Sequence, residues 1–381
     1  MKILMLNHEY PPIGGGGGYA GRNILRQFAG RSDIELDVVV SRPRPPTIIE
    51  RLADNITLYR VGVRKKAMQF WTRPEMIQWM AKAYRIHKKL LQQNQYDLAH
   101  AFFGFPTAAL TWRTVSKLPY IISLRGSDVP GVNVRFSLDY KLLAPVFRRI
   151  WGNASALYAC SEGLRQRALK FMPEAKIYVV PNGVELDRFC PVNNKQKIED
   201  LKLLTVGRLS ASKRIELLVS VVELIRKQFP NATLKIAGGG GLENQLRQLI
   251  KDKGMENCIA MLGIVPAEEM PELYRKSDIF VSASLQEGMS NAMLEAMASG
   301  LPIITTRCEG VQELIADNGI VVEQPEPELI AGAIKQVAND RNRYEQMSRA
   351  ARKRAEKFSW ESVASQYLDC YHKVLNYEAE N

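Results

Sequence analysis

Two glutamates, eight positions apart, are the residues whose types and spacing point most directly to chemistry. Glu287 precedes Gly288 in a turn, and Glu295 lies in the segment that follows. The apolar stretches 279–283 and 302–306 predict two buried strands, so the residues between them predict the helix of a strand-helix-strand unit. Glu287 then lies in the loop after the first strand, with Glu295 about two turns into the helix on roughly the same side. The alternative for such spacing is a solvated helix face.

The helix start beside Glu287 predicts a phosphate-binding turn. In open α/β sheets, ligands bind at the C-terminal ends of the strands, and the first backbone N–H groups of a helix suit an anion. The N–H groups of residues 288–291 have that place. Two carboxylates beside a phosphate cradle indicate a ligand with many hydroxyls, such as a sugar together with a ribose.

Two cations follow an earlier strand at a matching position. Arg208 and Lys213 lie between the predicted strand 202–206 and a helix, at the same depth as Glu287. A solvated basic turn explains them poorly, because basic residues at a helix start oppose the positive end of the helix dipole. We expect them to clamp a diphosphate and to neutralise the charge that develops on a leaving nucleoside diphosphate. Because the sequence shows no metal-binding cluster, we expect this to proceed without a metal ion.

A run of five glycines follows the first predicted strand and opens a helix. This is the position at which Rossmann domains hold a pyrophosphate. The backbone of Gly15, Gly16 and Gly17 is open to a phosphate or a sugar, since no side chain covers it. An NAD site is the alternative, with Asp33 or Asp37 on the ribose, but the loop lacks the Gly-x-Gly-x-x-Gly spacing and contains two prolines.

The segments around Glu287, Arg208 and the glycine run together resemble those of the retaining glycosyltransferases of family four. The resemblance extends from Lys2 to about Phe358 and includes the Gly-Leu-Pro-Ile sequence after the acidic pair. It implies an α/β architecture called GT-B, in which two Rossmann-like, doubly wound parallel-sheet domains face each other across a cleft. It also implies that the C-terminal helix returns to the N-terminal domain.

The resemblance implies transfer of a sugar, with retention, from a UDP- or GDP-linked donor to a hydroxyl acceptor, with no further cofactor. Glu295 would bind the ribose hydroxyls, and Glu287 would accept hydrogen bonds from hydroxyls of the donor sugar. The leaving diphosphate, held by Arg208 and Lys213, would take the proton of the acceptor in a front-face substitution. The backbone at five further positions would contact the nucleotide, the sugar or its phosphate: Gly238, Val265, Gly288, Met289 and Ser290.

One position departs from the family pattern. Where relatives usually have histidine at a strand end of the first domain, this chain has Arg125, within Ile122-Ser-Leu-Arg-Gly-Ser-Asp128. Arginine cannot act as a base near pH 7, but its planar fork can bind a sugar hydroxyl or an anionic acceptor. We therefore expect Arg125 to position the substrate, with Asp128 either orienting it or capping the following loop. His8 and His100 are alternative proton carriers or, more simply, structural residues at strand ends.

Positive charge is concentrated in the N-terminal half. Residues 1–190 hold 28 Lys and Arg against 14 Asp and Glu, whereas the remainder holds 24 against 26. Many of the basic residues lie within 64–89 beside Phe70, Trp71 and Trp79, a mixture that predicts an amphipathic helix. Such a helix would dock on an anionic membrane surface, or it is an ordinary half-buried helix whose aromatic residues belong to the core. No nucleic acid is expected as a partner, because no recognised motif accompanies the charge.

Strands and helices alternate along the chain, which predicts two parallel sheets. We expect residues 1–190, with the final helix 359–381, to form an acceptor-binding domain and residues 191–358 to form a donor-binding domain. The polar run 191–200 would link them. The predicted strands cover residues 2–7, 35–41, 56–61, 97–102, 120–124, 156–160, 176–180, 202–206, 233–237, 258–262, 279–282, 303–306 and 320–322.

The composition agrees with a cytoplasmic enzyme that acts in polysaccharide or envelope biosynthesis, at the inner face of a membrane if its acceptor is lipid-linked. No apolar run approaches the ~20 residues that span a bilayer, and the N-terminus has too short an apolar run for a signal peptide. Five scattered cysteines indicate neither a disulfide framework nor a zinc site. The alternatives are a nucleotide-sugar epimerase or hydrolase on the same fold, and a non-catalytic nucleotide- or membrane-binding protein.

Overall fold

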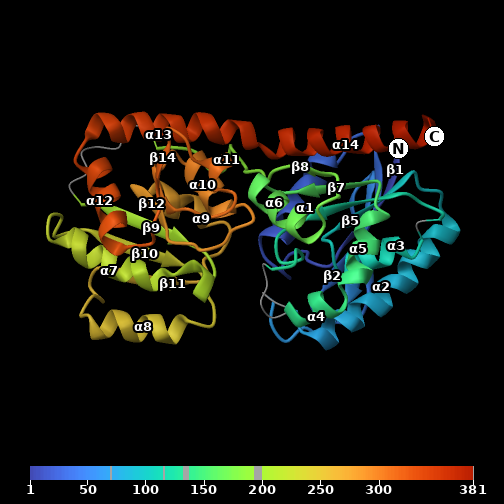
Figure 1. Ribbon diagram of the computed structural model, residues 1–381, viewed down its shortest axis with the longest axis horizontal. Coiled ribbons are helices and arrows are strands. Elements are labelled where there is room, and N and C mark those ends of the chain that lie inside the picture. The colour runs from blue at the N-terminus through green and yellow to red at the C-terminus, as the bar shows by residue number, and fades with distance from the viewer. Residues whose placement is uncertain (69–70, 115, 132–136, 193–199, 381) are drawn as a thin grey trace. The chain divides into compact units, whose positions relative to one another are not determined.

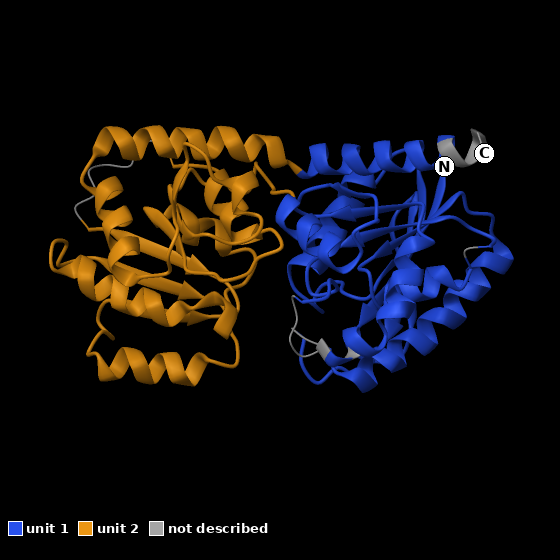
Figure 2. Cartoon of the chain, in the orientation of Figure 1, with its two compact units in different colours: residues 1–182, 360–381 blue, residues 183–359 orange. Residues whose placement is uncertain are grey.

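The computed structural model describes residues 1–68, 71–114, 116–131, 137–192 and 200–380 (Figure 1). The chain divides into two compact units (Figure 2): unit 1 is Met1–Asn182 with Trp360–Asn381, and unit 2 is Gly183–Ser359. The division thus precedes the boundary predicted after residue 190, and most of the predicted linker, residues 193–199, lies outside the described residues. Within the described residues, no helix is long and apolar enough to cross a membrane.

Unit 1 is built on one sheet, in which eight strands of the described residues pair in the order β3-β4-β2-β1-β5-β6-β7-β8. Neighbouring strands are parallel, except that β3 and β4 form an antiparallel pair at the edge. The strand order reverses between β1 and β5, so this sheet has the doubly wound topology that the sequence predicts. The strands are β1 (Lys2–Asn7), β2 (Glu35–Arg42), β3 (Ile48–Ala53), β4 (Ile56–Gly62), β5 (Leu98–Phe102), β6 (Tyr120–Leu124), β7 (Ala156–Ala159) and β8 (Ile177–Val179).

The last helix of the chain belongs to the core of unit 1. In Figure 2 the last helix, from Trp360 up to its grey end, has the colour of residues 1–182, and helix α14 packs beside helix α1. An apolar stripe from Trp360 to Val374 joins the core formed by β1, β2 and α1. The predicted return of the C-terminal helix is therefore confirmed. The helices of this unit are α1 (Gly16–Phe28), α2 (Arg73–Gln93), α3 (Thr107–Trp112), α4 (Ser137–Leu142), α5 (Ala144–Gly152), α6 (Glu162–Phe171) and α14 (Trp360–Glu380).

Helix α2 lies largely within residues 64–89, for which the sequence predicts an amphipathic helix. The helix begins only at Arg73, because Thr72 and Glu75 form a capping box and a proline occupies the first turn. Trp71 and Trp79 are buried, 5% and 0% exposed, so these aromatic residues belong to the core rather than to a membrane-facing surface. Phe70 lies outside the described residues.

Unit 2 contains a second sheet, with six strands of the described part of the chain in the order β11-β10-β9-β12-β13-β14. All of its strand pairs are parallel, and the order reverses between β9 and β12. The predicted fold class, two parallel-sheet α/β domains, is confirmed. The elements are β9 (Lys202–Val206), η2 (Ala211–Lys213), α7 (Ile215–Arg226), β10 (Thr233–Ala237), α8 (Glu243–Asp252), β11 (Ile259–Gly263), α9 (Met270–Arg275), β12 (Ile279–Ser282), α10 (Asn291–Ala298), β13 (Ile303–Thr306), α11 (Val311–Leu314), β14 (Gly319–Val322), α12 (Pro327–Ala338), α13 (Arg341–Ala355) and η3 (Glu356–Phe358).

Candidate functional site

The predicted donor-side residues lie at the carboxyl end of the unit 2 sheet, near the reversal between β9 and β12. Ligands of doubly wound sheets bind at such a reversal. Hydrogen bonds tie the loops together here, since the N–H of Leu285 donates to Ser212 O at 2.7 Å and the hydroxyl of Thr306 donates to Ser284 O at 2.8 Å. The loops after β9, β12 and β13 are therefore held side by side.

Glu287 and Lys213 form an ion pair at this point. Lys213 ends the short turn η2 after β9, and Glu287 lies in the loop after β12. The hydroxyl of Ser284 donates a further hydrogen bond to the Glu287 carboxylate at 3.1 Å. The side chains of Lys213 and Glu287 stay 19% and 14% exposed. The sequence predicts that Lys213 binds the diphosphate and Glu287 the donor sugar, and in the structure these two side chains contact each other.

Glu295 is held by helix α10 and by a tyrosine from α9. Ser290 caps α10 by accepting a hydrogen bond from a backbone N–H of the first turn at 3.3 Å. The hydroxyl of Tyr274 donates to the Glu295 carboxylate at 2.8 Å, and its ring packs between Phe189 and Phe280. Burial raises the pKa of Glu295 to about 7, although the Tyr274 hydrogen bond acts in the opposite direction. This carboxyl therefore changes charge near neutral pH.

The other predicted donor-side residues follow neighbouring strand ends. Gly238, after β10, has a φ of +138°, and a Cβ there would lie 1.9 Å from the carbonyl oxygen of Gly207. Only glycine fits at that position. Arg208 is exposed and forms no ion pair within the described residues, and Val265 is half-buried in the loop after β11. The turn into α10 is formed by Gly288, Met289 and Ser290.

In unit 1, the glycine run lies at the corresponding reversal, between β1 and β5. Helix α1 begins at Gly16, so the later glycines of the run form its first turn. The N–H of Gly15 donates to the Glu9 carboxylate at 3.2 Å. At Gly17, a Cβ would lie 2.5 Å from the ring of Phe103, so the helix start packs closely on the residue after β5.

His8 follows β1 and is buried among three aromatic side chains. The ring centroids of Trp71, Trp79 and Phe103 lie 5.4, 5.9 and 4.6 Å from that of His8. Burial lowers the pKa of His8 to about 3, and the positive charge of Lys65 adds to this effect. These are the surroundings of a structural histidine, the simpler of the two alternatives.

Arg125 follows β6 and is half-buried. Its guanidinium donates to the side-chain oxygen of Asn182 and, at 3.5 Å, to the hydroxyl of Tyr367. It also lies over the ring of Phe102, 4.7 Å from the centroid. Since Tyr367 belongs to α14, the last helix of the chain supplies a partner of a predicted site residue.

A buried polar network extends from Tyr367 into the sheet. The Ser123 hydroxyl lies 3.0 Å from the Tyr367 hydroxyl and 2.7 Å from His100 Nε2. The other nitrogen of His100 lies 2.8 Å from the hydroxyl of Tyr371. Burial lowers the pKa of His100 to about 3, and the charge of Arg125 adds to this. The neutral ring thus links β5 and β6 to α14.

Asp128 caps the loop rather than orienting the guanidinium of Arg125. Its carboxylate accepts the backbone N–H groups of Gly104 at 2.6 Å, Arg125 at 2.9 Å and Gly126 at 2.8 Å. The side chain is 4% exposed. Asp128 therefore ties the loop after β5 to the loop after β6 and fixes the backbone of Arg125.

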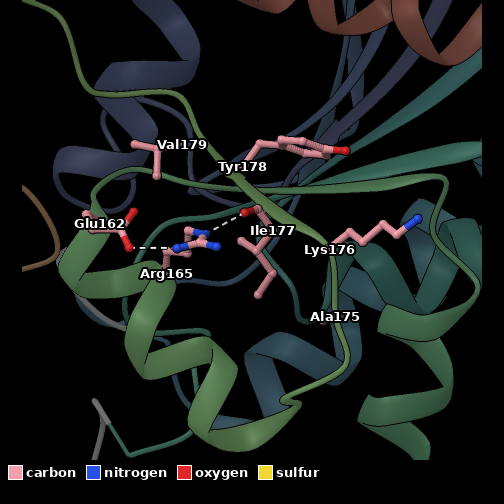
Figure 3. Close-up of a pocket in the computed structure, with 7 residues that line it drawn as sticks. All are labelled: Glu162, Arg165, Ala175, Lys176, Ile177, Tyr178 and Val179. Atoms are coloured by element: carbon pink, nitrogen blue, oxygen red, sulfur yellow. Dashed lines mark hydrogen bonds and ion pairs between the residues drawn. The ribbon is translucent and has the colours of Figure 1, made fainter.

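The hollow shown in Figure 3 lies away from the predicted site residues of the described chain, and the described residues hold no candidate metal site. Among the described residues, no three or more His, Cys, Asp or Glu side chains are placed to hold a metal ion. The hollow is lined by residues of α6, of β8 and of the loop that precedes β8. Arg165 lies in it, paired with Glu162 at 2.7 Å and donating to Ile177 O at 2.7 Å, so its charge is already satisfied.

Two family models cover nearly the whole chain. The model for Glycosyltransferase Family 4 matches residues 14–188, and the model for Glycosyl transferases group 1 matches residues 191–354. The chain belongs to the group-1, family-four type of glycosyltransferases. It is a glycosyltransferase, and its two Rossmann-like domains are those of the GT-B fold.

Relatives agree with this family, and a solved structure agrees with the fold, over nearly the whole chain. A glycosyltransferase of Methanocaldococcus jannaschii is 28% identical and covers 97% of this chain and 98% of its own. A GDP-mannose-dependent alpha-(1-6)-phosphatidylinositol monomannoside mannosyltransferase of Mycobacterium tuberculosis is 25% identical, with 97% of each chain covered. The structure of sucrose-phosphate synthase from Thermosynechococcus elongatus superposes with a TM-score of 0.84 over 99% of each chain, at 18% identity.

Four contact residues of this glycosyltransferase were not identified from its sequence. Each side chain supports a predicted residue through one hydroxyl or amide group: Tyr274, Ser284, Asn182 and Tyr367. Ser284 adjoins the acidic motif, and Asn182 stands in a Pro-Asn-Gly turn, so both were within reach of a sequence argument. The two tyrosines have the spacing of core residues, which hid their polar role.

Proposed function

We propose that this glycosyltransferase moves a sugar, with retention of configuration, from a UDP- or GDP-linked donor to a hydroxyl of an acceptor. The observation that carries the proposal is the contact between Glu287 and Lys213 at the β9–β12 reversal, with Glu295 on the helix that follows. Glu295 would bind the ribose hydroxyls, and Glu287 would bind hydroxyls of the donor sugar. Lys213 and Arg208 would bind the diphosphate.

The chemistry proposed for this site needs neutralisation of the leaving diphosphate. Lys213 would exchange its contact with Glu287 for the phosphate oxygens, which frees the carboxylate to accept from the sugar. The turn at Gly288, Met289 and Ser290 would face the same sugar and phosphate. As the bond between the anomeric carbon and the diphosphate breaks, the acceptor oxygen would bond to that carbon on the same face and give its proton to the departing diphosphate, so that configuration is retained. Because two cations supply the charge, we expect turnover to persist in the presence of a chelator.

Unit 1 is proposed to bind the acceptor through the strand end that carries Arg125, and Gly15, Gly16 and Gly17 stay the donor contacts that the sequence predicts. Biosynthesis of a glycan or an envelope polysaccharide, on a lipid-linked or anionic acceptor, is the role that we favour. The mycobacterial relative supports it, because by its name that enzyme acts on a phosphatidylinositol monomannoside. Association with an anionic membrane through residues 64–89 stays a prediction that rests on the exposed basic residues alone, since Trp71 and Trp79 are buried.

The proposal is tested first by thermal unfolding with UDP, GDP, ADP and NAD. A ligand at a hundred times its dissociation constant adds about 2.7 kcal/mol to stability. We expect one nucleoside diphosphate to stabilise the protein selectively, and its sugar donors are then assayed with candidate acceptors. Retention is checked from the anomeric configuration of the product by NMR.

Two outcomes would contradict the proposal. Stabilisation by NAD alone, or by none of the four compounds, would exclude the proposed donor site. Conversion of the donor at full rate without any acceptor would favour an epimerase or a hydrolase on the same fold.

A further inference from the structure

The guanidinium of Arg125 has only neutral partners within the described residues. It donates to the amide oxygen of Asn182 and to the hydroxyl of Tyr367, and it lies over the ring of Phe102. Its Nε–H is buried and has no hydrogen-bond partner. A guanidinium keeps its proton in a protein, so this side chain carries a full charge into a half-buried site.

No carboxylate of the described residues balances this charge. Asp128, three positions later in the chain, directs its oxygens to the backbone N–H groups of Gly104, Arg125 and Gly126. A desolvated charge without a counter-ion is unfavourable, and the fork geometry of arginine matches phosphate or carboxylate oxygens. An anion that reaches this half-buried guanidinium would balance its charge.

The guanidinium is also held in place before any ligand binds. Tyr367, its partner on α14, is fully buried and joined through Ser123 to His100 in the sheet. The stacked position over Phe102 and the bond to Asn182 restrict the remaining freedom. Because the side chain is already ordered, it loses less conformational entropy when a ligand binds.

We propose that Arg125 is the anion-binding group of the acceptor site, and that the acceptor of this enzyme carries a phosphate or another anionic group. The proposal rests on the proposed function, since it takes unit 1 as the acceptor side. The same chemistry occurs in the diphosphate of the donor, so the experiment must separate the two sources. The C-terminal helix takes part through Tyr367, as a positioning residue.

The test uses inorganic phosphate as the probe and the full-length protein saturated with the nucleoside diphosphate that stabilises it. Phosphate affinity is measured calorimetrically, with the ionic strength held constant by chloride. We expect phosphate to bind beside the nucleotide and Arg125→Gln to weaken phosphate binding at least about tenfold. Nucleotide affinity is expected to stay within about twofold, whereas Arg208→Gln should weaken nucleotide binding and leave phosphate binding unchanged.

Two hydroxyl deletions test the role of the last helix. Tyr367→Phe removes the hydroxyl that contacts Arg125 and keeps the buried ring, so phosphate affinity should fall about threefold to fivefold. Tyr371→Phe is the matched control, because its hydroxyl contacts His100 and not the guanidinium. Its phosphate affinity should equal that of the unchanged protein, even if its midpoint of thermal unfolding falls equally.

Equal phosphate affinity in the unchanged protein and in Arg125→Gln would overturn the proposal. A parallel loss of nucleotide and phosphate affinity in Arg125→Gln would also overturn it, by assigning the anion to the donor. Arg125→Lys, which keeps the charge without the fork, checks that a loss does not reflect misfolding, and it should restore part of the phosphate affinity. Absence of nucleotide binding in the unchanged protein would refute the proposed function separately, since Arg125-dependent phosphate binding is measurable without nucleotide.

Discussion

The pH dependence of nucleotide binding tests the place of Glu295 in the donor site. Burial raises the pKa of this carboxyl to about 7. Ribose hydroxyls are proposed to donate to its carboxylate, and the protonated group has less acceptor capacity. If the nucleotide binds the ionised form only, the apparent Kd is raised about elevenfold at pH 6 and about 1.1-fold at pH 8. We expect affinity to be about tenfold weaker at pH 6 than at pH 8, which is about 1.4 kcal/mol.

The assay is calorimetric titration with the stabilising nucleoside diphosphate between pH 6 and pH 8. A terminal phosphate also titrates near pH 6, so the affinity is expressed as a ratio to that of Glu295→Gln at the same pH. Glutamine does not ionise, and the ratio therefore isolates the carboxyl. Tyr274→Phe removes the hydrogen bond that lowers this pKa, so the midpoint should move above pH 7.

The free energy of unfolding of the ligand-free protein should change with pH in the opposite direction. The pKa of Glu295 is raised on folding, so ionising it opposes folding, and this penalty disappears as the pH falls through about 7 toward the ordinary glutamate range. The unchanged protein should therefore gain stability relative to Glu295→Gln over the interval in which it loses nucleotide affinity. A constant affinity ratio from pH 6 to pH 8 would refute the proposed contact with the ribose.

Two further predictions concern the donor side. Glu287→Gln should lower turnover, measured as nucleotide release, at least about a hundredfold. Nucleotide affinity should stay within about twofold, because Lys213 is released to bind the diphosphate. An equal loss of turnover and of nucleotide affinity would contradict the assignment of Glu287 to the donor sugar. Gly238→Ala should lower the free energy of unfolding in urea by about 2–3 kcal/mol, since its Cβ would meet Gly207 O at 1.9 Å. Gly241→Ala, where a Cβ meets nothing within 4 Å, is the control and should change it by less than about 1 kcal/mol.

Most strands could be predicted because parallel strands covered on both faces have continuous apolar sequences. The predicted strands 120–124 and 202–206 coincide with β6 and β9. Strand β3 was missed because it is an edge strand that alternates exposed and half-buried residues, among them Glu50 and Arg51. The available indication was the two-residue turn at 54–55, which joins β3 to β4 as a hairpin.

The start of helix α2 does not follow from the mixture of residues in 64–89. The mixture of basic and aromatic residues in 64–89 is a property of the whole segment. A helix start depends instead on the individual groups that accept hydrogen bonds from its first N–H donors. Thr72 and Glu75 provide those groups, and they were readable as a capping box with a proline inside it. Caps therefore locate a helix end better than an average over a segment does.

The surroundings of Arg125 could not be predicted because its partners come from distant parts of the chain. Periodicity shows that the side chain of Tyr367 faces the core, yet the same apolar stripe would result if its hydroxyl met water, a carbonyl group or a cation. The hydroxyl reaches Arg125, 242 positions earlier, only because α14 packs on the sheet of unit 1. A buried tyrosine needs a partner for its hydroxyl, so two tyrosines one turn apart on the last helix predict two hydrogen bonds without identifying the partners. In this enzyme, those partners are Ser123 and His100, and they connect the end of the chain to Arg125.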